Sequence, residues 1–217
     1  MHSEHDKTGV AGLILAGGLS RRMGGEPKAL MPLAGRPMIS HVIDRIRPHV
    51  DACILNVNGL ESAFAQFGLP LVADDFGDHA GPLAGLHAAM NWAAEHCAGV
   101  RWLVTAPCDT PFLPEDYVSA LTEAAGGNGE TIVIAASGGR GHFACGLWPI
   151  AHKDKLAAYL ASGERRTQSW IEQNPNISVT FPHIGGESGL DPFFNVNTPE
   201  DLAKAEDFIR AGGSRSA

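Results

Sequence analysis

The chain has 217 residues, of which 44% are apolar and 18% are charged. These proportions exclude a disordered or fibrous chain, and the length suits one sizeable hydrophobic core. The net charge of −8 argues against a nucleic-acid-binding protein, which usually carries a basic face, although a few local cations are enough to hold a small phosphate ligand.

Short apolar runs alternate with helical patterns along the chain. The apolar runs predict buried parallel strands, because both faces of such strands are covered. Apolar residues spaced about 3.6 apart predict helices, two of them beginning at prolines that suit a first helical turn. The predicted strands span residues 10–16, 53–57, 69–73, 102–106 and 131–136, and the predicted helices begin at Pro37, Pro82, near Pro114, at Lys153 and at Thr198.

This alternation predicts an α/β fold, a Rossmann-like three-layer sandwich with a mostly parallel central sheet. We expect residues 1–217 to form a single domain, with flexible tails at about 1–8 and 212–217. No basic stretch followed by an apolar stretch occurs near the start, and the longest apolar run is too short to span a bilayer. The four cysteines form no CxxC pair, which is typical of reduced thiols. We expect a cytoplasmic protein that contacts neither membrane nor nucleic acid.

In a sheet of this kind the ligand binds beyond the carboxyl ends of the strands. Gly17 and Gly18 follow the first predicted strand, and Asn56 ends the second. Asp74 follows the third strand and Asp109 follows the fourth. Carboxylate oxygens suit magnesium, but asparagine and aspartate are also common turn formers, so both interpretations stay open on spacing alone.

The segment 15–28 reads LAGGLSRRMGGEPK. It matches neither the Walker loop nor the Rossmann glycine pattern. Its glycines allow backbone amides to approach a base or phosphate, and its cations Arg21, Arg22 and Lys28 could balance a triphosphate. Two glycines alone would equally fit an ordinary turn followed by a solvated basic loop.

The full segment resembles the glycine-rich signature of the molybdenum cofactor guanylyltransferases, a family of nucleotidyltransferases. Three further segments are similar to that family and follow in the expected order: GPLAG at 81–85, CDTPFLP at 108–114 and NVNTPED at 195–201. The resemblance covers nearly the whole chain. It implies transfer of GMP from GTP to the terminal phosphate of molybdopterin or molybdenum-molybdopterin, with release of pyrophosphate.

The resemblance also implies roles for individual residues. Lys28, Arg22 and Asp109 are the expected catalytic residues, with Asp109 as the ligand of Mg²⁺. The expected acceptor-binding or metal-orienting residues are Asn195 and Asn197, the latter at a position where related sugar and cytidylyl transferases carry an aspartate. The expected nucleotide-binding residues are Leu15, Ala16, Gly17, Gly18, Lys28, Asn56, Asp74 and Asp109. Asp74 would accept hydrogen bonds from the guanine N1–H and amino group.

Residues 139–148 are similar to the family's acceptor-side stretch, with Phe143 where a proline is expected. Molybdenum insertion proteins and acceptor molybdoenzymes are the implied protein partners. One alternative is a cytidylyltransferase that uses CTP, although those enzymes typically carry Ala-Ala-Gly where this chain has Ala16-Gly17-Gly18. A second alternative is a non-catalytic nucleotide-binding protein on the same fold.

Overall fold

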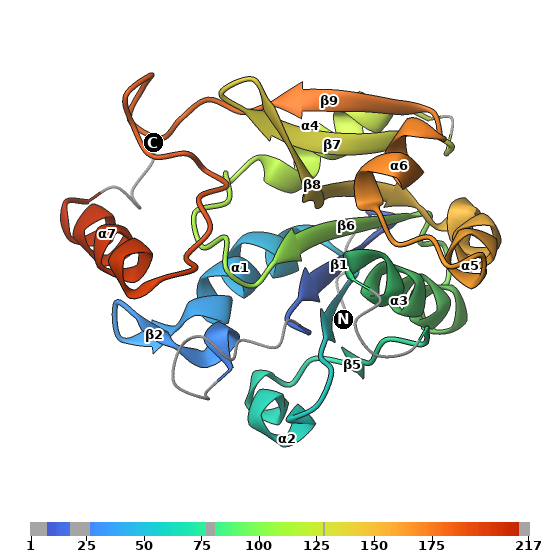
Figure 1. The fold of residues 1–217 in the computed structure, drawn as a ribbon, viewed down its shortest axis with the longest axis horizontal. Coiled ribbons are helices and arrows are strands. Elements are labelled where there is room, and N and C mark those ends of the chain that lie inside the picture. The colour runs from blue at the N-terminus through green and yellow to red at the C-terminus, as the bar shows by residue number, and fades with distance from the viewer. Residues whose placement is uncertain (1–7, 18–26, 77–80, 128, 213–217) are drawn as a thin grey trace, which may run out of the picture.

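A seven-stranded sheet forms the centre of the molecule in the computed structural model, which describes residues 8–17, 27–76, 81–127 and 129–212 (Figure 1). The strand order is β5-β4-β1-β6-β8-β7-β9. The strands are β1 (Val10–Leu15), β4 (Ala52–Asn56), β5 (Leu71–Val72), β6 (Trp102–Pro107), β7 (Ile132–Ser137), β8 (Arg140–Pro149) and β9 (Asn176–Thr180). The strands β2 (Pro32–Leu33) and β3 (Arg36–Pro37) form a separate two-stranded ribbon.

The sheet is mostly parallel, as the sequence predicts. β1 pairs in parallel with β4 and β6, β4 with β5, and β7 with β9. Within this sheet β8 alone runs the other way, because it pairs antiparallel with both β6 and β7. The prediction missed β8 and β9, and it made β5 longer than the two-residue strand that forms.

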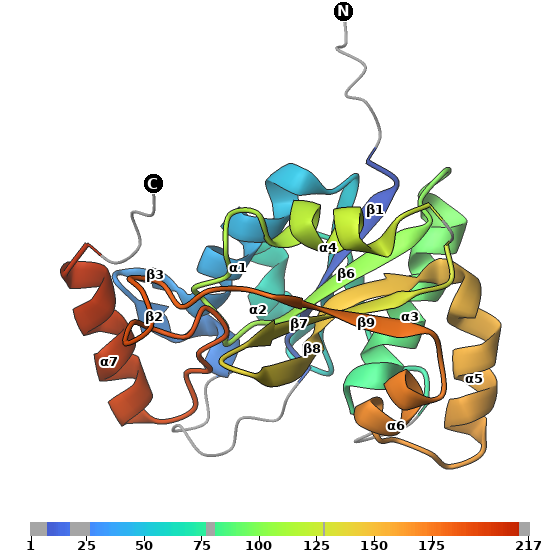
Figure 2. The same cartoon turned by 90° about the horizontal axis from the view of Figure 1, so that it is seen from above.

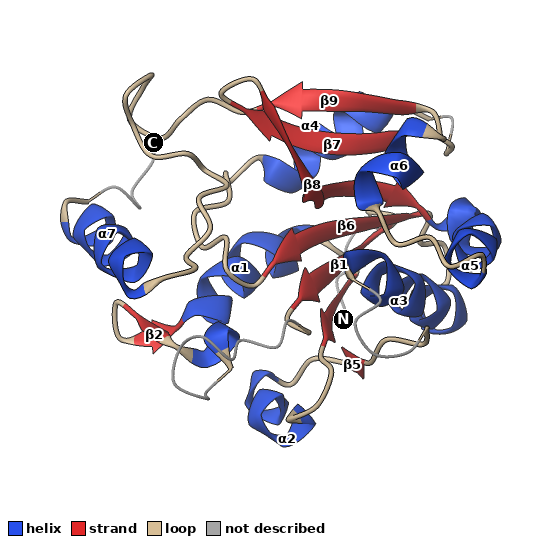
Figure 3. Ribbon diagram, viewed as in Figure 1, coloured by secondary structure: helices blue, strands red, loops and turns tan. Residues whose placement is uncertain are grey.

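Helices cover both faces of the sheet (Figures 2 and 3). Helices α1 and α4 lie on one face and α3, α5 and α6 on the other (Figure 2). The helices are α1 (Met38–Ile46), α2 (Glu61–Phe64), α3 (Pro82–His96), α4 (Tyr117–Ala125), α5 (Lys153–Ala161), α6 (Thr167–Glu172) and α7 (Pro199–Arg210). Short 3₁₀ helices span Lys28–Leu30, Arg47–His49, Ala65–Phe67 and Ile150–His152. None of the helices in the described ranges is long and apolar enough to cross a membrane.

Strand β1 is buried because its side chains enter two different cores. Val10 and Ile14 belong to the cluster beneath α1 and α4. Ala11 and Leu13 point the other way, into the cluster beneath α3 and α5. The twofold alternation of a strand explains this division, and it explains why a continuous apolar run marks the strand in the sequence.

The carboxyl ends of β1 and β6 form the edge that matters for binding. From β1 the chain first builds β4 and β5 on one side, and then returns through α3 to place β6 on the other side of β1. The strand order reverses between β1 and β6, and the carboxyl ends of the strands at such a reversal are the usual ligand position in sheets of this kind. Helix α7 and the β2–β3 ribbon lie beyond this edge, toward which the arrowheads of β1 and β6 point (Figure 1).

Candidate functional site

A lysine, an aspartate and two asparagines meet at the carboxyl end of β6. The Nζ atom of Lys28 donates a hydrogen bond to Asp109 Oδ2 (2.5 Å) and another to Asn197 Oδ1 (2.7 Å). Asn195 Nδ2 donates to the other carboxylate oxygen, Asp109 Oδ1 (3.0 Å). The Lys28 and Asp109 side chains are 13% and 16% exposed, so a ligand can reach a pair that is already largely desolvated. We call these four residues the charged cluster.

Local backbone structure positions the members of the charged cluster. Lys28 opens a 3₁₀ helix directly after Pro27. Asp109 sits in the turn after β6, where Thr110 Oγ1 donates to the Pro107 carbonyl (2.7 Å). The amide of Val196 donates to the carbonyl of Asp109 (3.0 Å), so the segment that carries both asparagines lies against this turn.

The start of α7 holds Asn197 from the other side. Asp201 accepts hydrogen bonds from the backbone amides of Asn197 and Thr198, and Thr198 accepts from the amide of Asp201, which completes a capping box. The hydrogen bond from the Asn197 amide is the main reason that the pKa of Asp201 lies below the ordinary value. The cap therefore fixes the backbone of a residue that contacts Lys28.

A second polar cluster lies beyond β4 and β5. The buried side chain of Asn56 donates through Nδ2 to Asp74 Oδ1 (2.9 Å) and to the carbonyl of Val72 (3.3 Å). Asn58 Oδ1 accepts from the backbone amide of Asp74 (2.9 Å). Among the described residues Asp74 Oδ2 has no hydrogen-bond partner. We call Asn56, Asn58 and Asp74 the amide cluster.

Two glycines make room for the amide cluster. A Cβ atom on Gly85 would lie 2.5 Å from Asn56 Oδ1 and 2.6 Å from its Cγ. A Cβ atom on Gly17 would lie 2.6 Å from Asn58 Nδ2 and 3.0 Å from Asn56 Oδ1. Neither glycine has a left-handed backbone, so both are required for close approach and not for a turn. The first turn of α3 and the end of β1 thus enclose Asn56.

The last residues of β1 join the two clusters. The carbonyl of Leu15 accepts from the amide of Cys108 (3.0 Å), next to Asp109, and the amide of Ala16 donates to the carbonyl of Asn56 (2.9 Å). The glycine-rich segment therefore begins between the charged cluster and the amide cluster. The structure brings together Leu15, Ala16, Gly17, Lys28, Asn56, Asp74, Asp109, Asn195 and Asn197, whereas Gly18 and Arg22 lie outside the described residues.

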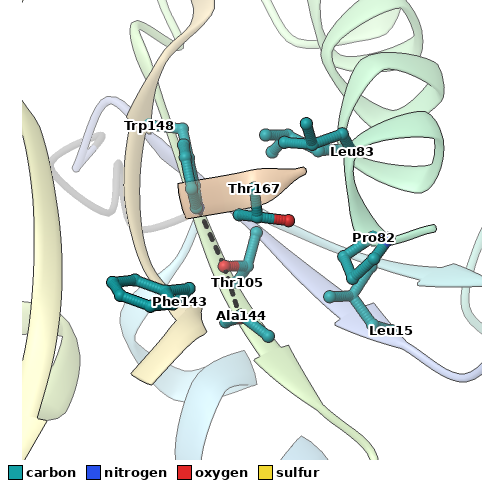
Figure 4. A pocket seen from close by; sticks show the side chains of 9 residues that line it. Leu15, Pro82, Leu83, Thr105, Phe143, Ala144, Trp148 and Thr167 are labelled. Carbon is teal, nitrogen blue, oxygen red and sulfur yellow. Dashed lines mark hydrogen bonds between the residues drawn. The ribbon is translucent and has the colours of Figure 1, made fainter. Parts of the chain in front are cut away.

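A small apolar pocket adjoins this edge on the α3 side of the sheet (Figure 4). Leu15, Pro82 and Leu83 line one side, and Phe143 and Trp148 from β8 line the other. Trp148 Nε1 donates to Thr105 Oγ1 (2.9 Å), which in turn donates to the carbonyl of Ala144 (2.9 Å). Phe143 is 39% exposed, so its aromatic ring borders the pocket and also reaches solvent.

Two polar contacts of Asp75, near the amide cluster, were not predicted. Asp75 Oδ2 is paired with His87 Nδ1 (2.8 Å) and accepts from Asn91 Nδ2 (3.2 Å), and both partners lie on α3. Asn58 and Gly85 also contribute to the site without having been assigned a role. The pairing with His87 ties the Asp75 side chain to α3, and no contact joins that side chain to the amide cluster among the described residues. A histidine on the predicted helix, two residues after GPLAG, was the available signal.

The chemistry of the charged cluster is that of a charge-stabilising site. Cys108 does not provide a nucleophile there, because burial and then the neighbouring Asp109 raise the pKa of its thiol to about 12. No group of three His, Cys, Asp or Glu side chains that could hold a metal ion occurs within the described ranges. Asp109 is a lone carboxylate flanked by amides and a lysine, a donor set that suits a magnesium ion held mainly by substrate phosphates and water.

Comparisons with known proteins agree with this architecture. A family model described as the MobA-like NTP transferase domain matches residues 12–177. A molybdenum cofactor guanylyltransferase of Bradyrhizobium sp. (strain ORS 278) is 42% identical over 200 residues, covering 92% of each chain. A molybdenum cofactor guanylyltransferase of Cereibacter sphaeroides is 44% identical over 199 residues, covering 92% of this chain and 96% of the relative.

Solved structures share the fold. The molybdopterin-guanine dinucleotide biosynthesis protein A of Archaeoglobus fulgidus superposes with a TM-score of 0.70 at 21% identity, over 93% of this chain and 99% of the other. A Mycobacterium tuberculosis protein in complex with manganese superposes with a TM-score of 0.64 at 16% identity, over 91% of this chain and 98% of the other.

Proposed function

Because the chain belongs to the MobA-like NTP transferases, among the molybdenum cofactor guanylyltransferases, we propose that it transfers GMP from GTP to the terminal phosphate of molybdopterin. The reaction releases pyrophosphate and forms the guanine dinucleotide form of the cofactor. The observation that carries the proposal is the charged cluster, in which Lys28 and Asp109 meet at the carboxyl ends of β1 and β6.

The proposed mechanism needs no protein nucleophile. An oxygen of the acceptor phosphate attacks the α-phosphorus of GTP, and the bond to the bridging oxygen of the leaving pyrophosphate breaks. The protein positions the two substrates and offsets charge, as in phosphoryl transfer generally. Lys28 places its ammonium against the phosphates, and Arg22 is proposed to assist it.

Asp109 is the proposed protein ligand of Mg²⁺, with the Asn195 and Asn197 side chains orienting the ligands around it. A bound magnesium ion would neutralise phosphate charge and align the reacting groups. The charged cluster supports this assignment because Asn195 holds one carboxylate oxygen of Asp109 and Lys28 contacts the other. The lysine can exchange its carboxylate partner for a phosphate when substrate binds.

The amide cluster is the proposed nucleoside site. Backbone amides of Gly17 and Gly18 approach the nucleotide, and Leu15 and Ala16 form the floor beneath it. Asp74 reads the guanine N1–H and amino group, two donors that cytosine does not present. The burial of Asn56 between Gly17 and Gly85 supports the reading, because Asn56 then holds Asp74 in one orientation.

The pterin acceptor is proposed to lie on the β8 side of β1. The amide cluster lies beyond β4 and β5, on one side of β1, whereas Phe143 extends from β8 on the opposite side. Phe143 and the apolar pocket give a flat ring system a surface to pack on, and the phosphates then meet at the charged cluster between them. This division places the amide cluster and Phe143 on opposite sides of β1, with Leu15 between them.

The proposal includes a single nucleotidyltransferase domain over 1–217, a cytoplasmic location, and handover of the product among molybdenum insertion proteins and acceptor molybdoenzymes. The cysteine content, four residues without a CxxC pair, fits a reducing compartment. The predicted tails fall almost entirely outside the described residues.

The test is incorporation of label from α-labelled GTP or CTP into molybdopterin, with pyrophosphate release measured in parallel. GMP transfer that exceeds CMP transfer by about 100-fold or more is expected, because Asp74 pairs with two guanine donors. Equal or preferred use of CTP would overturn the nucleotide assignment, and binding without pyrophosphate release would indicate a non-catalytic protein.

Asp74→Ala should lower the preference for GTP over CTP while Asp75→Ala, one residue along, leaves it in place. Asp75 bonds to α3 and not to the amide cluster, so it is a matched control. Unchanged discrimination in Asp74→Ala would remove Asp74 from base recognition.

A further inference from the structure

A polar network lies at the same edge of the sheet, at the end of β7 and the start of β8. Ser137 ends β7 and is 2% exposed. Its hydroxyl donates to Asp191 Oδ1 (2.8 Å) and lies 2.7 Å from His142 Nε2. Asp191 Oδ1 also accepts from the backbone amide of Phe193 (2.8 Å). The network therefore joins two strands to the loop that follows β9.

The order of these bonds excludes a hydrolytic triad. In a triad the histidine lies between the serine and the carboxylate, whereas here Ser137 lies between His142 and Asp191. The one hydroxyl proton goes to Asp191, so the Ser137 oxygen accepts from His142 Nε2–H. Burial lowers the pKa of His142 and so favours its neutral ring, whose Nε2–H tautomer can donate this hydrogen bond. Ser137 therefore anchors Asp191 and is not a nucleophile.

The loop held by Asp191 is the one that carries Asn195 and Asn197. Phe193 is fully buried, and its ring packs on His142 (4.6 Å) and Phe181 (5.5 Å) between centroids. Two residues further on, Asn195 bonds to Asp109 Oδ1. With Asp191 and Phe193 fixed on the sheet, only one residue separates the anchor from the asparagine that contacts Asp109.

We propose that Asp191 is a positioning residue for GMP transfer. By fixing the loop through Ser137 and the Phe193 amide, it holds Asn195 against Asp109 in the orientation that the reaction requires. The inference rests on the proposed role of Asp109. Side chains placed about 1 Å from their productive positions lose large rate factors, so the anchor contributes to rate and not only to stability.

The test is a double-mutant cycle on kcat for GMP transfer at saturating GTP and magnesium. Asp191→Ala should lower kcat by about tenfold or more, because the loop loses two hydrogen bonds to a carboxylate. Combined with Asn195→Ala it should lower kcat by less than about threefold further, because the partner through which it acts is already gone. Asp191→Asn retains an oxygen that accepts from both Ser137 and Phe193, and it should recover most of the rate.

The matched control is Asp51, whose carboxylate also accepts two backbone amides, those of Thr8 (2.8 Å) and Gly9 (2.9 Å), but at the opposite edge of the sheet. Asp51→Ala should lower the free energy of unfolding and leave kcat within about twofold.

Multiplicative losses in the Asp191 and Asn195 cycle, or wild-type kcat in Asp191→Ala, would overturn the inference. Should Asp191→Ala fail to fold, Ser137→Ala tests the same route: its loss of kcat must vanish in the Asn195→Ala background. The unaltered protein and Asp109→Ala, measured in the same assay, distinguish failure of the positioning role from failure of the proposed function. Absence of GMP transfer by the unaltered protein refutes the proposed function, and full activity in Asp109→Ala refutes the role of Asp109. Inactivity of Asp109→Ala together with a failed cycle refutes the positioning role alone.

Discussion

Gly85→Ala probes the amide cluster from the helix that encloses it. The added Cβ would lie 2.5 Å from Asn56 Oδ1, 2.6 Å from Cγ and 3.0 Å from Nδ2, so the whole amide must move. Asn56 is 4% exposed and has no space to rotate into without losing its bonds to Asp74 and Val72. The substitution therefore acts on base recognition as well as on packing.

The expected cost follows from these contacts. Overpacking costs about 1–3 kcal/mol, and the two hydrogen bonds of Asn56 contribute about 1 kcal/mol each. We expect a loss of about 3 kcal/mol in the free energy of unfolding and a melting temperature lower by about 6–12 °C, measured by urea and thermal denaturation. The KM for GTP should rise by about tenfold, which corresponds to about 1.4 kcal/mol of lost binding.

Two variants separate the packing effect from the recognition effect. Gly12→Ala places a Cβ 2.5 Å from Ile46 Cγ2 in the apolar core, so it should lower stability without changing the KM for GTP. Asn56→Ala removes the atoms that Gly85→Ala would meet, so the double variant should be no less stable than Asn56→Ala alone. An unchanged KM in folded Gly85→Ala would refute the placement of the nucleoside beside Asn56.

Three further predictions concern the charged cluster and its surroundings. Lys28→Ala and Asp109→Ala should each lower kcat by about 100-fold or more in a pyrophosphate-release assay, with the fold intact by circular dichroism. Arg36→Ala, which removes an exposed ion pair, should leave kcat unchanged. Wild-type rates in Lys28→Ala and Asp109→Ala would refute the proposed mechanism. Asp201→Ala should lower the free energy of unfolding by about 1 kcal/mol above pH 4, measured by urea titration. The pKa of Asp201 is lowered in the folded state, so its contribution to stability is present above the unfolded-state pKa of about 3.9 and is lost as pH falls through the folded-state pKa. An equal loss of stability at pH 2 would contradict this. Cys108 should resist alkylation by iodoacetamide at pH 8 in the native protein and react after unfolding, as measured by mass spectrometry. Rapid alkylation of the native protein at Cys108 would contradict its raised pKa.

The sequence predicts the parallel half of the fold because its strands are continuous apolar runs. Residues 10–16 and 102–106 match β1 (Val10–Leu15) and β6 (Trp102–Pro107) closely. β8 escaped prediction because the first half of Arg140–Pro149 is exposed or half-buried and mixes polar and apolar residues, so the strand is buried only from Cys145 onward. β9 is an edge strand whose side chains are mostly exposed, so it lacks the apolar run.

The site could be predicted only in part, because some of its residues lie far apart in the sequence and meet only in the folded chain. The rule that ligands bind beyond the carboxyl ends of strands singles out Gly17, Asn56, Asp74 and Asp109. It says nothing of Lys28, which lies 81 residues from Asp109 and 169 from Asn197, yet contacts both. Family resemblance supplied those residues, whereas local patterns could not. The requirement for glycine at position 85 depends on Asn56 and emerges only when the two are seen in contact.

The most direct test of the central claim is a crystal structure of the protein with Mn²⁺ and a GTP analogue that cannot transfer its nucleotide. We expect an anomalous peak within about 2.2 Å of an Asp109 carboxylate oxygen, next to the phosphates, with the Lys28 ammonium in contact with a phosphate oxygen. A metal-bound triphosphate held elsewhere, with the Lys28–Asp109 pair unaltered, would contradict it.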